Sequence, residues 1–374
     1  VGIGIWGLSE MTTIACTYIQ PLSDALVANI GLVKPIVDGG VGVEILAAFN
    51  FKYASLMIPL GILLNVVLLL LKFTKTVDVD VWNFWSWLLS AELLYQVTGS
   101  YVVAFIGFFL TGAISLKLGD LQAPIMQKVY GLPGVSFPHP CSTWYALPAP
   151  LFEKLFNLIG LDKIKADPDS IQEKLGALGD TTVLGGIIGF VIAIMAGMPV
   201  GKWFYYAIVF AAITMLFPTV IGFLVEGLVP ISNAARTMLQ KKFGGREFYI
   251  GLDCAIGVGQ PANVVANAIA IPIFVLLALF LPGIGVLPAA GVAVGCGFGL
   301  ASAMPYFNNN IIKGVLYISI MMIPTLYMVT WVAPLITQVY VAAGGVVPAG
   351  TEITCSTSGY MWSHVMAWIA HFFA

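Results

Sequence analysis

The chain has 374 residues, of which 59% are hydrophobic and 9% are charged, and its formal net charge is −2. A soluble domain carries roughly 25% charged residues, so this composition excludes an ordinary soluble domain and predicts a multi-pass membrane protein. The charge balance shows no footprint for nucleic acid. Five cysteines without a CxxC pair argue against a disulfide framework and a thiolate metal site. Because Val1 stands inside an apolar run, we expect a missing N-terminal segment, not a signal peptide.

The first part of the chain contains one clear span and one interrupted apolar run. Residues 1–18 are expected to be the remainder of a larger helical unit, and residues 20–50 a loop or re-entrant piece. Residues 53–71 approach the roughly 20 apolar residues that a spanning helix needs. Residues 82–116 are apolar but broken at 98–100, which predicts two short spans or one bent hairpin.

The second part begins with a water-exposed loop, 151–180, in which Asp167 before Pro168 predicts a helix start. Further spans are expected at 183–198, 203–224, 269–281 and 311–340. The sequence Asn308-Asn309-Asn310 predicts a turn. Basic residues gather at 72–75, 154–174, 236–246 and 313. All four groups can lie on one side, which the positive-inside rule makes cytoplasmic.

Two Pro- and Gly-rich segments, 131–150 and 251–267, each follow a basic stretch and precede a span. Paired interruptions of this kind point to the binding site of a transporter with inverted repeats. The predicted fold is an all-α polytopic membrane protein with broken helices and re-entrant hairpins. We expect a single domain over 1–374. Its parts would be half-repeats at 53–150 and 181–341, the cytoplasmic loop between them, and a C-terminal segment at 342–374.

Asp253 is the strongest candidate site residue. It opens a broken apolar segment, and freed backbone at membrane depth is tolerated only beside protein or a polar cavity. Its carboxylate could accept hydrogen bonds from substrate hydroxyls and take a proton from one of them. The alternative is an N-cap, because an Asp before a helix satisfies exposed amides. Both roles are compatible.

His139, between two prolines, is the second candidate, as a substrate-binding group or general base; the alternative is a buried histidine satisfied by a carbonyl. Glu92 lies within an apolar run, where an acid is costly unless it lines a cavity, although it could also sit at a membrane end. Amides and hydroxyls that could extend the polar face are Gln96, Thr98, Ser100, Ser142, Gln260 and Asn263. Trp144 and Tyr145 could stack on a sugar or pack at the lipid interface.

Other residues are interpreted as structural. Cys141 and Cys254 are expected to be small packing residues, and His364 and His371 to be packing or interfacial. No ligand spacing predicts a metal site, and no cofactor is expected.

Several motifs resemble one transporter family. They are LKFTKTVDVDVWNFW (71–85), VTGS (97–100), LGD (118–120), FPH (137–139), IKADPDSIQEKLGALGD (164–180) and KKFGGREFYIGLD (241–253). In this order they resemble the galactitol-type enzyme IIC of the bacterial phosphoenolpyruvate-dependent phosphotransferase system. The resemblance covers nearly the whole chain. LDCA and the histidine segment are more distantly similar to the ascorbate permease of the same superfamily.

The resemblance implies a homodimeric permease of the bacterial cytoplasmic membrane, with a scaffold and a mobile core that carries substrate. It supports His139 and Asp253 at the substrate site. It also implies partner IIA and IIB proteins, with IIB supplying a phosphoryl group from a phosphocysteine. The protein would then be the membrane subunit of a polyol phosphotransferase. Departures from the family pattern at 138–142, at Gly259-Gln260 and at Glu92 leave open galactitol, another hexitol or a pentitol.

Two other functions compete with this interpretation. An ion-coupled polyol transporter without phosphorylation would use Glu92 and Asp253 as proton carriers. A purely structural membrane subunit is disfavoured by the broken polar segments.

Overall fold

The structure, a computed structural model, describes residues 35–80, 82–242, 245–287, 291–355 and 361–374, with Pro21, Leu22, Ala25, Ala28 and Asn29. The first half of the chain forms β1 (Ile36–Asp38), α2 (Val41–Phe49), α3 (Met57–Leu70), β2 (Thr76–Asp78), α4 (Trp82–Thr98), α5 (Tyr101–Tyr130), β3 (Val135–Ser136), α6 (Pro140–Ala146) and α7 (Ala149–Leu158). The second half forms α8 (Pro168–Leu175), α9 (Thr181–Met195), α10 (Val200–Lys242), β4 (Tyr249–Gly251), α11 (Ala255–Val258), α12 (Pro261–Phe280), β5 (Val286–Leu287), α13 (Gly291–Ala303), α14 (Ile311–Ala342), β6 (Glu352–Thr354) and α15 (Met361–His371).

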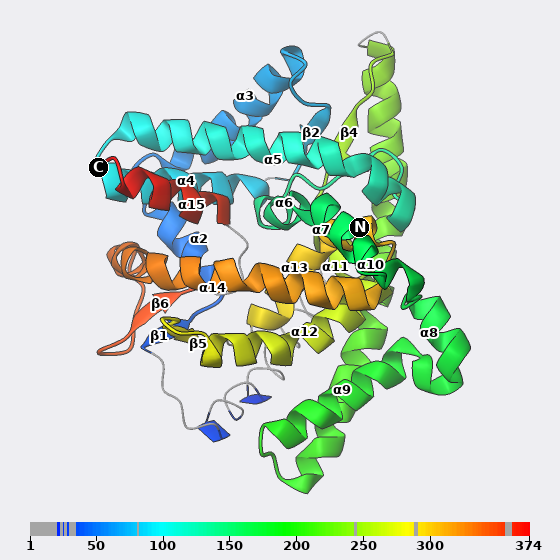
Figure 1. Cartoon of the computed structure of the whole chain (residues 1–374). Helices are drawn as coiled ribbons and strands as arrows, with labels where there is room; N and C mark the ends of the chain where they lie inside the picture. The colour runs from blue at the N-terminus through cyan, green and yellow to red at the C-terminus, as the bar shows by residue number, and fades with distance from the viewer. Residues whose placement is uncertain are drawn as a thin grey trace.

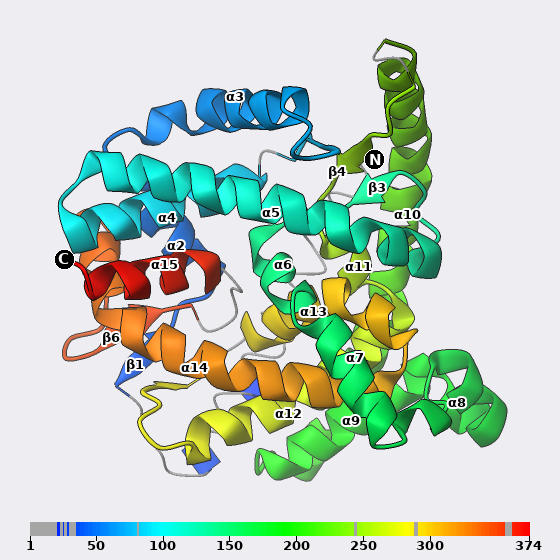
Figure 2. The same cartoon turned by 45° about the horizontal axis from the view of Figure 1, so that its top comes forward.

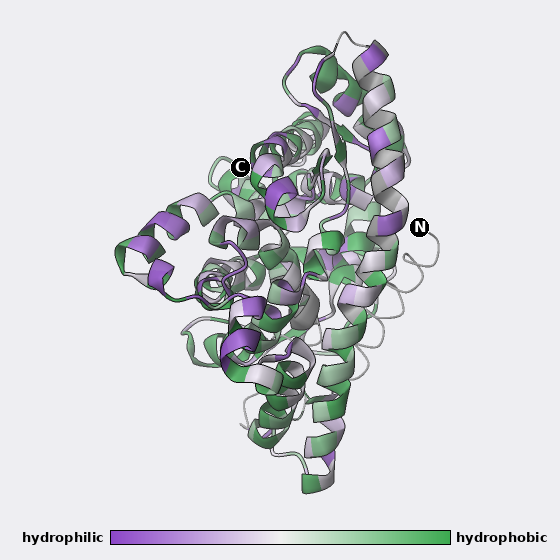
Figure 3. Ribbon diagram, turned by 90° about the vertical axis from the view of Figure 1, so that its right-hand side faces the viewer, coloured by the Kyte–Doolittle hydropathy of each residue, from purple (hydrophilic) through white to green (hydrophobic). Residues whose placement is uncertain are grey.

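The described residues include four helices that are long and apolar enough to cross a membrane. They are α5, α12, α14 and the part of α10 over Val200–Val220. Two bent pairs raise the number to six if each pair is one span: α2 with the helical stretch Ala54–Leu70, and Pro168–Gly179 with α9. Figure 3 shows that α10 is apolar along one half and polar toward its end at Lys242. The prediction of a mostly helical, multi-pass protein is confirmed.

The predicted break after residue 98 is confirmed as the junction of α4 and α5. Gly99 adopts φ 66°, in the left-handed region that favours glycine. Ser100 then caps α5 by accepting a hydrogen bond from the amide of Val103 at 3.4 Å. The second piece is not short, however, because α5 continues beyond residue 116 to Tyr130. Figures 1 and 2 show α5 and α14 as two long helices with α6, α13 and α15 between them.

Other local predictions have mixed outcomes. Asp167 caps α8 through the amide of Ser170, and Asn308 and Asn309 form a left-handed turn that leads into α14. The range 20–50 is not simply a loop, because its described part contains β1 and α2. The expected span 269–281 is the second half of α12, which begins at Pro261. The prediction for 1–18 lies outside the described residues.

Two small parallel sheets, which the all-α prediction missed, are embedded among the helices. One has the strand order β5-β1-β6 and the other β2-β4-β3. In the second sheet, Thr76 pairs with Tyr249 and Val135 with Ile250. Strands of two or three residues inside apolar runs have too few positions to show an alternating pattern. Because β2 and β3 lie before residue 150 and β4 after residue 248, this sheet joins distant parts of the chain.

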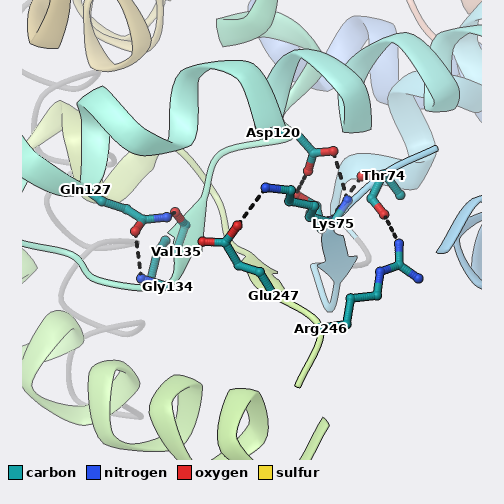
Figure 4. A network of polar contacts seen from close by, with 9 residues as sticks. Thr74, Lys75, Asp120, Gln127, Gly134, Val135, Arg246 and Glu247 are labelled. Carbon is teal, nitrogen blue, oxygen red and sulfur yellow. Dashed lines mark hydrogen bonds and ion pairs between the residues drawn. The ribbon is translucent and has the colours of Figure 1, made fainter. Parts of the chain in front are cut away.

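The carboxylate of Asp120 on α5 holds the amino-terminal side of the β2-β4-β3 sheet. It accepts hydrogen bonds from the amide of Lys75 and the hydroxyl of Thr76, each at 2.8 Å (Figure 4). The Thr76 hydroxyl is also 2.8 Å from that of Ser136 at the end of β3. Asp120 on α5 is therefore connected with β2 directly and with β3 through the Thr76 hydroxyl.

Arg246 and Glu247, which precede β4, bind the segment that precedes β2. Arg246 donates to the carbonyls of Leu69 at 2.6 Å and Thr74 at 3.0 Å, and Glu247 pairs with Lys75 at 2.6 Å (Figure 4). The basic groups at 72–75 and 236–246 therefore meet, as expected if both lie on one side of the membrane. Lys313 likewise pairs with Glu153 at 2.9 Å, beside the basic group 154–174.

Candidate functional site

Three polar side chains converge where the strands of the β2-β4-β3 sheet end. Asp80 follows β2, His139 follows β3 and Asp253 follows β4, each two or three residues past the strand. One ligand atom from each lies within 4.8 Å of those of the other two. The carboxyl ends of parallel strands meet at one edge, which is where open sheets commonly bind ligands. The structure thus brings together the two predicted residues and adds Asp80, which the sequence analysis did not identify.

The orientation of His139 is set by Asn83 at the start of α4. The Nδ1 atom of His139 lies 2.6 Å from Oδ1 of Asn83, and Nδ2 of Asn83 donates to both carboxylate oxygens of Asp78 at 3.1 Å. Because the side-chain nitrogen of Asn83 donates to Asp78, its side-chain oxygen must accept from His139, which assigns a proton to Nδ1. Nε2 is then the ring nitrogen that can take a proton or bind a ligand.

The loop that presents His139 is rigid and buried. Pro140 occupies the first turn of α6, a position that its fixed φ suits. The imidazole is 1% exposed and stacks on Phe298 with 5.7 Å between ring centroids. The alternative of a buried histidine satisfied by a carbonyl is therefore met at Nδ1, by the amide carbonyl of Asn83, and it leaves Nε2 to serve a substrate.

The two carboxylates face the imidazole in a partly exposed position. Oδ1 of Asp253 accepts a hydrogen bond from the amide of Ala255 at 2.8 Å, so it stabilises the start of α11 as the capping interpretation expected. Its position beside Asp80 and His139 leaves room for a second role. Burial raises the pKa of Asp80 to about 6, the Asp253 carboxylate acts in the same direction, and His139 opposes both. Two nearby acids beside one base form a site suited to hydroxyl donors.

Of the predicted amide and hydroxyl groups, Ser142 contacts His139, whereas Asn263 and Gln260 are held at the break between α11 and α12. Ser142 donates to the carbonyl of His139 at 3.1 Å, and Asn263 donates to the Tyr130 hydroxyl at 2.9 Å and to the Gly257 carbonyl. The Oδ1 atom of Asn263 is buried without a hydrogen-bond partner among the described residues. Gln260 occupies the N-cap position of α12, at the break after α11.

Comparison with known proteins identifies the family. A family model described as "PTS system sugar-specific permease component" matches residues 1–350. The chain is 34% identical over 360 residues to the "PTS system galactitol-specific EIIC component" of Escherichia coli K12, covering 96% of this chain and 80% of that protein. It is 32% identical over 348 residues to a "Putative permease IIC component" of the same organism, covering 92% and 79%.

The chain belongs to the PTS sugar-specific permease family. The resemblance seen in the sequence motifs is therefore confirmed. Its members are integral membrane components of a phosphotransferase system that work with IIA and IIB proteins. The similarity to galactitol-specific relatives supports transport of a sugar alcohol.

A second group of predicted residues in the permease lies at the other end of α4. Glu92 is buried and accepts hydrogen bonds from Asn50 at 2.9 Å and Gln96 at 2.8 Å. Nine residues of helix separate it from Asn83, about 13 Å at 1.5 Å per residue. Thr98 and Ser100 lie farther along, where they bond to backbone. The structure does not bring these four residues to His139, and their role in substrate binding stays a prediction.

The remaining aromatic and histidine candidates of the permease have identifiable partners. Trp144 packs edge-to-face on Trp362 with centroids 5.2 Å apart. The Tyr145 hydroxyl lies 3.1 Å from that of Thr325 in the core, which does not suit a sugar-stacking surface. His364 contacts Glu44 at 2.9 Å, and both side chains are fully buried. His371 packs on Trp331.

Proposed function

We propose that the permease imports a polyol, galactitol or a related hexitol or pentitol, and presents it for phosphorylation by a phosphorylated IIB protein. The observation that carries the proposal is the convergence of Asp80, His139 and Asp253 at the strand ends. Carboxylates accept hydrogen bonds from hydroxyls, and a neutral imidazole can accept one proton. A polyol offers several hydroxyls to such a cluster. The galactitol-specific relatives support this substrate class.

The proposed reaction requires one base and accurate positioning. Asp253 and Asp80 hold the reacting hydroxyl against Nε2 of His139. The hydroxyl oxygen attacks the phosphorus of the IIB phosphocysteine, the new O–P bond forms and the S–P bond breaks. The thiolate remains on IIB, and the hydroxyl proton passes to His139. Phosphoryl transfer depends chiefly on positioning and charge stabilisation, which suits a site with one weak base.

Translocation belongs to the same proposal. The half-repeats at 53–150 and 181–341 would form a scaffold and a mobile core that carries substrate, in an elevator-type movement within a homodimer of the cytoplasmic membrane. The β2-β4-β3 sheet supports a core to which both half-repeats contribute, because it links His139 from one half with Asp253 from the other. The basic groups at 154–174 and 236–246 are candidate docking surfaces for IIB.

The test uses inside-out vesicles loaded with radiolabelled polyols, with purified phospho-IIB and the soluble components outside. The proposal predicts polyol phosphate outside the vesicles and identifies the substrate by which polyol is converted. Empty vesicles and unphosphorylated IIB are the controls. Polyol flux driven by a proton gradient, without phosphorylated product, would instead establish an ion-coupled transporter.

A further inference from the structure

His139 also belongs to a second cluster. The proposed reaction uses neither of the two cysteines in this cluster. His139, Cys141 and Cys254 are all buried, and one ligand atom from each lies within 4.8 Å of the other two. The cysteines come from different strand ends, since Cys141 is on α6 after β3 and Cys254 follows β4. The absence of closely spaced cysteines in the sequence argued against a thiolate metal site. That criterion does not detect two cysteines brought together by a sheet.

The dimensions of the cluster fit a tetrahedral metal ion. Zn²⁺ binds thiolate sulfur at about 2.3 Å and imidazole nitrogen at about 2.0–2.1 Å. In a tetrahedron these lengths separate neighbouring ligand atoms by about 3.6–3.8 Å. Atoms that already lie within 4.8 Å of one another reach these separations through small side-chain movements. No backbone segment needs to unfold.

The surroundings have two further features of a metal site. Metal-bound histidines almost always donate their other ring N–H to an oxygen acceptor, which fixes the ligating nitrogen. Here Nδ1 of His139 donates to Asn83, so Nε2 is the nitrogen that can ligate. Two thiolates would neutralise a divalent cation in this buried position. Asp80 and Asp253, which are partly exposed, also lie near His139 and add negative charge that favours a cation.

We propose that His139, Cys141 and Cys254 bind a borderline-soft divalent transition-metal ion, with Zn²⁺ the best match to one nitrogen and two sulfur ligands. The fourth position is open to water or to a neighbouring carboxylate. A bound ion occupies Nε2 of His139. If the proposed function is correct, the ion therefore competes with the polyol, and the permease is inhibited by Zn²⁺.

The direct test is a titration of the purified, reduced full-length chain in detergent with Co²⁺, a spectroscopic substitute for Zn²⁺. The wild type should show a near-ultraviolet thiolate-to-cobalt absorption band that saturates at one ion per chain and disappears when Zn²⁺ is added. Cys141→Ser and Cys254→Ser should lose the band. Cys355→Ser is the matched control, because Cys355 is equally buried but outside the cluster, and it should keep the band. Cys16 and Cys296 remain in every variant.

The absence of a thiolate band in the wild type would overturn the proposal, as would an undiminished band in the double variant Cys141→Ser/Cys254→Ser. If the serine variants do not elute as monodisperse protein, the site is tested by alkylation of the wild-type cysteines with and without Zn²⁺. Zn²⁺ should then slow alkylation of Cys141 and Cys254 relative to Cys355, and equal slowing at all three would contradict the site.

The test is independent of the proposed function, because it uses neither polyol nor IIB. A separate measurement addresses inhibition. Zn²⁺ should lower polyol phosphorylation by the wild type and by Cys355→Ser, and lower it less in each cluster variant relative to that variant's own activity without metal. Metal binding without inhibition would retain the metal site and reject the competition.

Discussion

Oδ1 of Asn83 lies 2.6 Å from Nδ1 of His139, and Asn83 is in turn bound to both carboxylate oxygens of Asp78. The start of α4 thereby sets the tautomer of a histidine that is 56 residues later in the chain. Oδ1 of Asp78 also accepts from the amide of Asp80, which positions one of the two acids of the cluster. One chain of hydrogen bonds thus positions both the base and one of its neighbouring carboxylates.

Asn83→Leu should lower polyol phosphorylation by about 10²-fold or more, because an unheld imidazole loses the tautomer and the position needed for general base catalysis. The loss should appear in kcat, with a changed pH profile and a smaller change in KM. Steady-state assays across pH check this.

Gln338→Leu, which removes an exposed amide from α14, is the matched control and should behave as the wild type. An Asn83→Leu protein with an unchanged pH profile and kcat would show that Asn83 does not position the base.

The buried Glu44–His364 pair makes a prediction about stability. Oε2 of Glu44 and Nδ1 of His364 have no hydrogen-bond partner among the described residues, so the two side chains depend on each other. Removing one partner of a buried pair costs about 3–5 kcal/mol, whereas replacing both with apolar residues is often neutral or stabilising. His364→Leu should therefore lower the unfolding midpoint in detergent strongly, and Glu44→Met/His364→Leu should recover most of it. A double variant as unstable as the sum of the singles would contradict this interpretation.

Arg246 and Glu247 should differ in importance although they are neighbours. Arg246 donates to two backbone carbonyls that precede β2, and charged hydrogen bonds of this kind contribute about 1.5–3 kcal/mol. The Glu247–Lys75 pair is about half exposed on both sides, and such pairs contribute about 0–1 kcal/mol. Arg246→Met should destabilise the permease measurably in thermal unfolding, and Glu247→Gln should not. Equal effects would show that the backbone contacts of Arg246 are unimportant.

Gly119 allows α5 to approach the segment that carries His139. A Cβ atom at this position would lie 3.1 Å from the Cα atom of Pro138, where backbone must move. Gly119→Ala should reduce polyol phosphorylation by displacing His139, while the protein still inserts and folds. Gly42→Ala is the matched control, because no atom lies within 4 Å of the added methyl group and alanine favours a helix. Phosphorylation by Gly119→Ala at the control rate would contradict the close approach.

Much of the helical arrangement could be predicted from the sequence. The break at Gly99, the cap at Asp167 and the interruption after Asp253 have local signals, because glycine, capping acids and prolines act on their own neighbourhood. The apolar run ends at residue 116, but α5 continues to Tyr130, and Asp120 in this continuation bonds to β2.

Only some residues of the site could be predicted from the sequence. His139 and Asp253 stand out because polar groups are rare in apolar, broken segments. Asp80 and Asn83 lie in the alternating run VDVDVWN (77–83), which has no local signal for a site, and only the β2-β4-β3 pairing places them beside His139. The contact between Cys141 and Cys254 likewise depends on tertiary structure. Glu92 has a clear local signal but lies far along α4.

The most direct test of the account is a single-turnover transfer of the phosphoryl group from phospho-IIB to polyol in the permease and its variants. The account predicts that His139→Gln and Asp253→Asn each slow the transfer by about 10²–10⁴-fold. His371→Gln and Glu352→Gln, which change a histidine and an acid outside the cluster, should transfer at the wild-type rate. Undiminished transfer in His139→Gln and Asp253→Asn would contradict the placement of the reaction at the ends of β3 and β4.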